Sequence, residues 1–254
     1  MHIRQNIESM SEADIATYQR AIARALAITD NRGYQHFAGL HGWPQNLCKH
    51  HVSLFLPWHR AYLYMFELSL RDVAGEIALP WWDWTSEEAH RFGLPDAFTA
   101  GQGGLASVPV PLDPPTLQAV QQQVPWALDL TGAVPKTTRN PDPADSLPTI
   151  AEVDDVLDAP TYADFTSRLE DIHDGIHGWF KGTMSIVPFA AFDPIFWAHH
   201  AMIDRLWYRW QLRHPGIGVP NEIADSALEG FPLTVPQVLD IATLGYDYAT
   251  GVVA

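Results

Sequence analysis

Histidines are frequent and unevenly placed in this chain. Twelve of its 254 residues are histidine; five lie between positions 36 and 59, and four lie between positions 173 and 200. Imidazole is the commonest metal ligand among side chains, and it also titrates near neutral pH. The single cysteine excludes a disulfide framework and a cysteine-based zinc cluster. The clustered histidines therefore point first to a metal site built from imidazoles.

The pair His173 and His177 has the spacing of two ligands on one helix face. Residues four apart in a helix lie one above the other, so both imidazoles can reach one ion. Two surface histidines on an amphipathic helix would show the same spacing, but Ile172 and Ile176 indicate that this face is buried. A zinc protease would carry glutamate directly after the first histidine, where this chain has Asp174, so a protease is disfavoured.

The adjacent residues His199 and His200 cannot both face one site from a helix, because neighbouring positions point about 100° apart. His200 and Asp204 are four residues apart and share a face with Trp197. We therefore expect His200 to point inward and His199 to pack beside it.

The first half of the chain supplies a second set of donors, His41, His50 and His59. Three histidines from each half would make two sites of three imidazoles. Three imidazoles leave an open coordination position on a metal, as catalysis requires. Imidazole ligation suits copper, zinc, iron or nickel, so the residues alone leave the metal open.

Two longer motifs around these histidines resemble the copper signatures of the type-3 dicopper family, which comprises tyrosinases, catechol oxidases and hemocyanins. The first signature is matched by His50, Phe55, His59-Arg60, Leu63 and Glu67. The second is matched by Asp193-Pro194, Phe196, His200 and Asp204, preceded at the expected place by His173 and His177. The matches extend over much of positions 33 to 212, so chance agreement at this density is implausible.

The resemblance implies a dinuclear centre of two copper ions, with O2 as co-substrate. The ligands that it implies are His41, His50 and His59 for the first copper and His173, His177 and His200 for the second. His36 competes with His41, and His51 competes with His50. The His-Gly context favours His41, and the four-residue gap before Phe55 favours His50.

Cys48 stands two residues before His50. Fungal tyrosinases and mollusc hemocyanins carry Cys-x-His with a thioether that joins the cysteine to the histidine. The resemblance therefore implies a Cys48–His50 crosslink. The alternative is a buried free thiol, the usual fate of a lone cysteine.

Acidic side chains are expected close to the coppers. Asp174 stands where many tyrosinases carry an asparagine thought to help a water remove the phenol proton, and this departure puts monophenol hydroxylation in question. Glu170 precedes His173 by three residues, so it is expected near the site as well. Asp174 and Glu170 are the predicted catalytic groups.

Other residues are expected to shape and support the pocket. The resemblance places Gly178, Val187 and Phe196 at the substrate pocket, where glycine and valine leave access open. Arg60 and Asp204 are expected to form a structural ion pair next to the ligands.

These features predict a polyphenol oxidase that converts o-diphenols to o-quinones. An o-aminophenol oxidase and a hemocyanin-like O2 carrier are the alternatives within the family, and a zinc hydrolase that uses His173 and His177 is the alternative outside it. Tyr246 and Tyr248 resemble the motif that closes the family's core domain, with Arg4 as the expected partner. Because the chain ends six residues later, the expected relatives are short bacterial-type enzymes without a lid domain.

Four helices are predicted to position these residues, over 11–30, 57–75, 161–178 and 193–214. Ser11 and Thr161 are each followed three residues later by aspartate, the form of a capping box. Pro57 and Pro194 suit a first helical turn. Positions 34 to 56 are expected to be irregular, because Gly39, Gly42 and Pro44 interrupt the helical pattern there.

Positions 93 to 160 differ in composition from the rest, because they hold eleven of the 20 prolines. They predict a long surface excursion with one short helix near 115–123. Strand signals are few. The expected architecture is therefore mainly α: a single domain over 1–254, in which a four-helix bundle encloses the dinuclear copper site among long irregular loops.

The composition limits the partners. A formal net charge of −15 argues against a nucleic-acid-binding protein, which needs a basic surface. No run of 18 apolar residues is present, so no membrane span is predicted. The N-terminus has no apolar signal segment, which predicts a cytoplasmic protein unless a partner exports it. The expected partners are small phenols and a copper-delivery protein, and the oligomeric state is left open.

Overall fold

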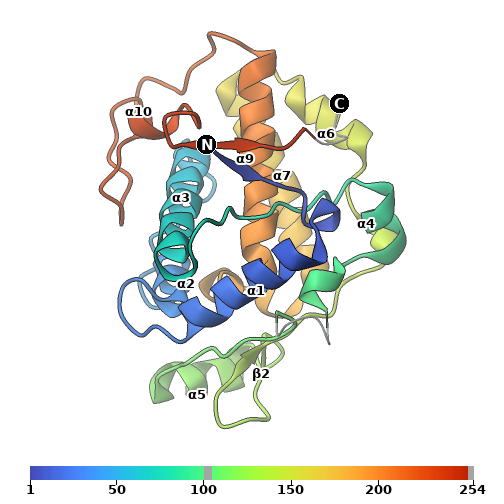
Figure 1. The fold of residues 1–254 in the computed structure, drawn as a ribbon, viewed down its shortest axis with the longest axis vertical. Helices are drawn as coiled ribbons and strands as arrows, with labels where there is room; N and C mark the ends of the chain where they lie inside the picture. The colour runs from blue at the N-terminus through green and yellow to red at the C-terminus, as the bar shows by residue number, and fades with distance from the viewer. Residues whose placement is uncertain (100–104, 251–254) are drawn as a thin grey trace.

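The computed structural model describes residues 1–99 and 105–250, and helices dominate it (Figure 1). The longer helices are α1 (Glu12–Leu26), α2 (Tyr34–His41), α3 (Phe55–Ala74), α4 (Glu87–Phe92), α5 (Pro114–Gln123), α6 (Ile150–Leu157), α7 (Tyr162–Phe180) and α9 (Ile195–Arg213). Two single-turn helices are α8 (Val187–Ala190) and α10 (Val235–Val238). The mainly α architecture predicted from the sequence is confirmed.

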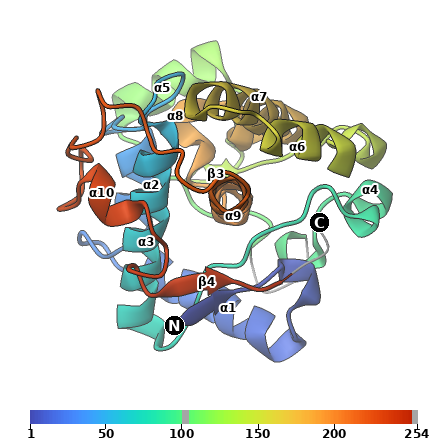
Figure 2. The same cartoon turned by 90° about the horizontal axis from the view of Figure 1, so that it is seen from above.

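Helix α9 lies at the centre of the molecule. Figure 2 looks along its axis, with α2 and α3 on one side, α6 and α7 on another, and β4 below. Apolar and aromatic residues occur on every side of α9, and 14 of its residues are buried. All residues from Ile195 to Trp207 are buried, which is the pattern of a helix surrounded by other elements.

The four predicted helices are present as α1, α3, α7 and α9, with shifted ends. The side chains of Ser11 and Thr161 accept hydrogen bonds from the backbone N–H groups three residues on, so both cap their helices as expected. α1 ends at Leu26 rather than Asp30, and α3 begins two residues before Pro57. α7 continues past Gly178 to Phe180. Helix ends fray and are the least reliable part of such predictions.

The expectation of an irregular segment over 34–56 is wrong for its first part, which forms α2 and carries His41 at its end. Gly39 lies inside this helix. A Cβ atom at Gly39 would stand 2.9 Å from the Cδ atom of Pro44, so glycine permits the following loop to fold back on the helix. The same residue that suggested a break therefore serves close packing.

The proline-rich excursion is more ordered than expected. The short helix is present as α5, capped by Asp113, but a second one, α6, was not predicted, although Thr149 and Glu152 form a capping box at its start. Residues 100–104 of the excursion lie outside the described residues. Arg139 anchors the segment by donating to both carboxylate oxygens of Asp193, at 2.7 and 2.5 Å, just before α9.

Two short sheets complete the described fold. β1 (His2–Arg4) pairs in parallel with β4 (Tyr246–Tyr248), so the first and last described segments lie side by side (Figure 1). β2 (Leu128–Asp129) pairs antiparallel with β3 (Lys136–Thr137) inside the excursion. None of the described helices combines the length and apolar character needed to cross a bilayer.

Candidate dinuclear metal centre

Three histidines of the first half of the chain meet at one end of the bundle. His41 ends α2, His50 lies in the loop between α2 and α3, and His59 lies in the second turn of α3. Their ring centroids are 5.2 Å apart for His41 and His50, 5.2 Å for His50 and His59, and 5.6 Å for His41 and His59. The structure thus brings together all three residues that the sequence selected; we call them the first triplet.

The second triplet comes from α7 and α9. His173 and His177 lie one turn apart on α7, and both point toward His200 on α9. The Nε2 atom of His200 is 3.3 Å from Nε2 of His173 and 3.2 Å from Nε2 of His177. Three imidazole nitrogens therefore converge on one small volume.

The two triplets face each other. The rings of His59 and His200 stack with centroids 4.7 Å apart, and those of His50 and His173 are 5.6 Å apart. Ligand atoms of His41, His59 and His200 also lie within 4.8 Å of one another. Two ions bound by these triplets would therefore be close neighbours, as a dinuclear centre requires.

Hydrogen bonds set the tautomers of several rings. Nδ1 of His59 lies 2.8 Å from the carbonyl oxygen of Phe55, and Nδ1 of His177 lies 2.7 Å from that of Met184. Because a carbonyl oxygen only accepts, both Nδ1 atoms carry the proton, and each Nε2 atom presents a lone pair. His173 is held similarly, since its Nδ1 is 2.9 Å from Oδ1 of Asp174. Such contacts fix the ring orientation of metal ligands.

The donor set fits a cation. Nε2 of His50 and of His59 and both ring nitrogens of His41 are buried without a hydrogen-bond partner. Buried polar atoms without partners are costly and rare, so several in one place call for an explanation. Copper or another ion that prefers imidazole would satisfy them together.

Burial keeps these imidazoles neutral. It lowers the pKa of His50 and of His177 to about 4; at His50 the charge of Asp174 opposes this shift and His51 adds slightly to it. Burial also takes the pKa values of His41, His59, His173 and His200 well below 6.5. At pH 7 the rings therefore need to lose no proton before they bind a metal.

The competing histidines differ in how they are placed. His51 has a side chain that is 71% exposed, and His36 stands apart from the histidine cluster. His199 is completely buried, has no hydrogen-bond partner at either ring nitrogen, and has a donor atom within 4.8 Å of those of His173, His177 and His200. Proximity of donor atoms therefore leaves His199 as a rival of His200, and its predicted packing role stays a prediction.

Cys48 is half-buried and has a free thiol. Its Sγ atom lies within 4.8 Å of donor atoms of His41 and His50. Burial raises the pKa of this thiol to about 11. The crosslink to His50 thus has its two partners close together, and the thioether itself stays a prediction.

Two histidines of each triplet line one pocket of about 360 Å³. Its lining consists of His41, His50, His51, His173, Asp174, His177, Gly178, Met184, Ser185, Val187 and Ala190. Asp174, Gly178 and Val187 are thus part of the pocket lining, and their expected roles toward a substrate stay predictions. Sequence reasoning missed Met184, whose carbonyl orients His177, because a contact between separate elements leaves no local signal.

Phe196 and Glu170 lie near the centre but outside the pocket lining. Phe196 is buried behind the ligands and stacks on His200 with centroids 4.0 Å apart. Glu170 accepts a hydrogen bond of 2.6 Å from the backbone N–H of His51, a residue with a left-handed φ of 55°. Glu170 therefore holds the loop that follows His50.

A network of buried charges supports α3 and α9 from behind. Nε of Arg60 donates to Asp204 at 2.5 Å, which is the ion pair expected from the sequence. Asp204 also accepts from Arg4 at 3.2 Å and from the hydroxyls of Tyr246 and Tyr248 at 2.6 Å each. The network joins the β1–β4 ribbon to the helices that carry the ligands.

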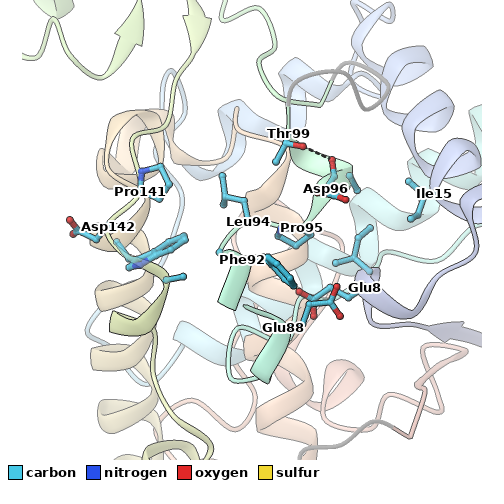
Figure 3. A pocket seen from close by; sticks show the side chains of 15 residues that line it. Glu8, Ile15, Glu88, Phe92, Leu94, Pro95, Asp96, Thr99, Pro141 and Asp142 are labelled. Carbon is cyan, nitrogen blue, oxygen red and sulfur yellow. Dashed lines mark hydrogen bonds between the residues drawn. The ribbon is translucent and has the colours of Figure 1, made fainter. Parts of the chain in front are cut away.

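A larger cavity lies elsewhere. It measures about 670 Å³ and is lined by four carboxylate residues, Glu8, Glu88, Asp96 and Asp142, together with apolar side chains such as Phe92 (Figure 3). It shares no lining residue with the histidine pocket. Size therefore does not identify the chemical centre; the convergence of unpartnered donors does.

Comparisons with known proteins agree with this geometry. The family model for the common central domain of tyrosinase matches residues 31–213, a range that contains both triplets. The tyrosinase of Streptomyces lincolnensis is 35% identical over 196 residues, which cover 68% of this chain and 70% of that protein. An A-type hemocyanin of Enteroctopus dofleini, units Ode to Odg, is 31% identical over 285 residues, which cover 97% of this chain but only 22% of that protein.

The fold is shared with solved structures. The tyrosinase of Burkholderia thailandensis superposes with a TM-score of 0.77 over 99% of this chain and 75% of that one. The two sequences are 18% identical, so this likeness concerns the fold alone.

Proposed function

Because the chain belongs to the tyrosinase family of type-3 copper proteins, we propose that it is a copper-dependent polyphenol oxidase that converts o-diphenols to o-quinones. Each diphenol gives up two electrons and two protons. One O2 accepts four electrons and four protons to become two waters, so two diphenols are oxidised for each O2.

We assign the first triplet to one copper and the second triplet to the other. Two copper ions bound there would supply the electron transfer and the activation of O2. The chain supplies the neutral donors, fixes their orientation through the carbonyls of Phe55 and Met184, and surrounds them with aromatic core. Burial of the rings also keeps water from competing for the donor atoms.

Asp174 and Glu170 take different parts in this proposal. One carboxylate oxygen of Asp174 holds His173, and the side chain is 47% exposed at the pocket, where it can accept a proton from a bound phenol. Glu170 is a positioning residue, because its carboxylate orders the backbone at His51 and does not line the pocket. Hydroxylation of monophenols would be a further activity of the same site, and turnover of tyrosine tests it.

The observation that carries the proposal is the open pocket above both triplets. Four of its lining residues are exposed, namely His51, Asp174, Gly178 and Val187, and Val187 is 47% exposed. A volume of about 360 Å³ suits a small organic ligand. An O2 carrier needs to exclude phenols, so the exposed mouth of this pocket supports an oxidase. The similarity to octopus hemocyanin makes O2 carriage the second candidate.

The test is oxygen uptake by the copper-loaded chain with catechol, tyrosine and o-aminophenol, recorded together with absorbance in the same cell. An oxidase consumes one O2 for every two o-quinones formed from catechol. Reversible O2 binding without quinone would overturn the proposal in favour of the carrier. Turnover of o-aminophenol without catechol turnover would assign the alternative oxidase.

A further inference from the structure

We infer that this pocket selects phenols that carry a positive charge over phenols that carry a carboxylate, and that Asp174 is the specificity-determining residue. The inference rests on the proposed function, because it concerns substrates of the same site. It follows from which charged groups lie at the mouth of the pocket, defined by the exposed lining residues His51, Asp174, Gly178 and Val187.

The mouth carries one carboxylate and no permanent cation. Among the described residues that line the pocket, Asp174 is the only acidic side chain, and neither lysine nor arginine is present. The two lysines nearest in sequence are engaged elsewhere: Lys49 pairs with Glu229, and Lys181 pairs with Asp142. A substrate carboxylate would therefore meet a like charge, and an ammonium group would meet an opposite one.

The imidazole of His51 does not reverse this balance. Its Nε2 lies 3.5 Å from Oδ2 of Asp174, and its Nδ1 lies 3.9 Å from Oε1 of Glu170. Two carboxyl groups thus face one imidazole. The side chain of Asp174 is 47% exposed, so solvent reaches it and a ligand can as well.

Gly178 leaves the place next to this carboxylate on α7 without a side chain. It lies one helical turn after Asp174 on α7, so both residues share one face. A Cβ atom added at Gly178 would meet nothing within 4 Å. The space around this Cβ position is open, so an arginine there would supply a cation at the mouth while improving helix propensity.

The experiment compares three catechols that share one ring: dopamine, neutral 4-methylcatechol and 3,4-dihydroxyphenylpropionic acid. For the copper-loaded chain we expect kcat/KM to fall in that order, with the amine favoured over the acid by roughly fivefold or more, mainly through KM. The ratio should shrink in 0.5 M salt, because salt screens exposed charges.

Substitutions test whether Asp174 causes the preference for the amine over the acid. Asp174→Asn and Gly178→Arg should each lower the amine-to-acid ratio by roughly fivefold, whereas the neutral matched control Gly178→Gln should leave it unchanged. Asp155→Asn removes an exposed carboxylate outside the pocket, and it controls for the net charge of −15. A ratio that follows net charge equally in Asp155→Asn and Asp174→Asn would overturn the assignment to Asp174.

The outcomes separate the two proposals. Absence of quinone from 4-methylcatechol would contradict the oxidase function, while equal kcat/KM for the amine and the acid would contradict only the charge selection. A calorimetric titration of the copper-loaded chain without O2, using tyramine and 4-hydroxyphenylpropionate, gives the same comparison without turnover. Tighter binding of tyramine, weakened by Gly178→Arg, is expected; equal dissociation constants would refute the inference.

Discussion

A histidine serves as a metal ligand when one ring nitrogen is deprotonated and free of other partners. In this site, carbonyl groups provide that condition for two rings. Phe55 stands four residues before His59, so the helical prediction already implied that its carbonyl could reach the ring. Met184 reaches His177 from the segment between α7 and α8, and no spacing in the sequence could reveal that contact. The motifs and the family resemblance thus predicted which histidines would lie together, but their tautomers were only partly predictable.

His199 and His200 differ in one observable way, although both are buried. Nε2 of His200 converges with two Nε2 lone pairs, whereas His199 stacks its ring on His173 with centroids 5.4 Å apart. His200→Ala should therefore reduce the copper content to one ion per chain, and His199→Ala should retain two. Metal analysis of the two purified variants checks this expectation. Loss of copper only in His199→Ala would exchange the roles of the two residues.

Glu8 gives a pH-dependent prediction away from the metal centre. Burial, with a further contribution from the charge of Glu88, raises the pKa of Glu8 to about 7 (Figure 3). The folded state thus holds a proton that the unfolded state has released, so stability falls as pH rises from about 4.5 through 7. Glu8→Gln should raise stability by about 1 kcal/mol at pH 8, after allowance for solvent screening, and by less at pH 5.

Thermal unfolding of the wild-type chain and of Glu8→Gln at both pH values measures this difference. The hydrogen bond from Ser86 can be kept, because the amide oxygen of glutamine also accepts. An equal stabilisation at pH 5 and pH 8 would show that Glu8 does not titrate as described.

Among the elements, the two helices that supply the second triplet were the most predictable. The cap at Thr161 and the many apolar and aromatic residues of α9 both have direct physical meaning, and both helices formed as expected. The failure at α2 has an equally direct cause: Gly39 relieves a contact with Pro44 that arises only after the chain folds back. Tertiary contacts decide such positions, and local propensity does not contain them.

The connection between elements depends on Asp204. It lies on α9 and accepts from Arg60 on α3 and from Arg4 on β1, and all three side chains are buried. Asp204→Asn would leave the buried Arg4 with Glu67 as a carboxylate partner, whereas the other acceptors that contact Arg60, Gln211 and the carbonyls of Val238 and Leu239, are neutral. We expect a loss of about 3–5 kcal/mol in the free energy of unfolding, because removal of one partner from a buried pair is costly.

Urea unfolding measures the loss in the free energy of unfolding caused by Asp204→Asn, and Asp155→Asn is the matched control. Asp155 pairs with Arg168 at the surface, where its side chain is 77% exposed, so its replacement should cost less than about 1 kcal/mol. Similar losses for both variants would mean that the buried network contributes no more than a surface ion pair.

At the scale of the whole molecule, the fold brings residues 41–59 and 173–200 together around one volume. Sequence motifs predicted which histidines belong to each triplet, and the family match covers the same range. The sequence could not show that the triplets face each other across α3, α7 and α9, because that distance depends on how the helices cross. The structure shows the facing arrangement through the stacked rings of His59 and His200.

The central claim is that two coppers, one in each triplet of the same molecule, act together on o-diphenols. The most direct measurement is a titration of the copper-free chain with copper, in which bound metal and the rate of quinone formation from 4-methylcatechol are recorded at each step. The account predicts that the rate stays low while the first equivalent binds, rises with the second and saturates at two ions per chain. A rate that saturates at one ion, or a chain that binds two ions and forms no quinone, would contradict it.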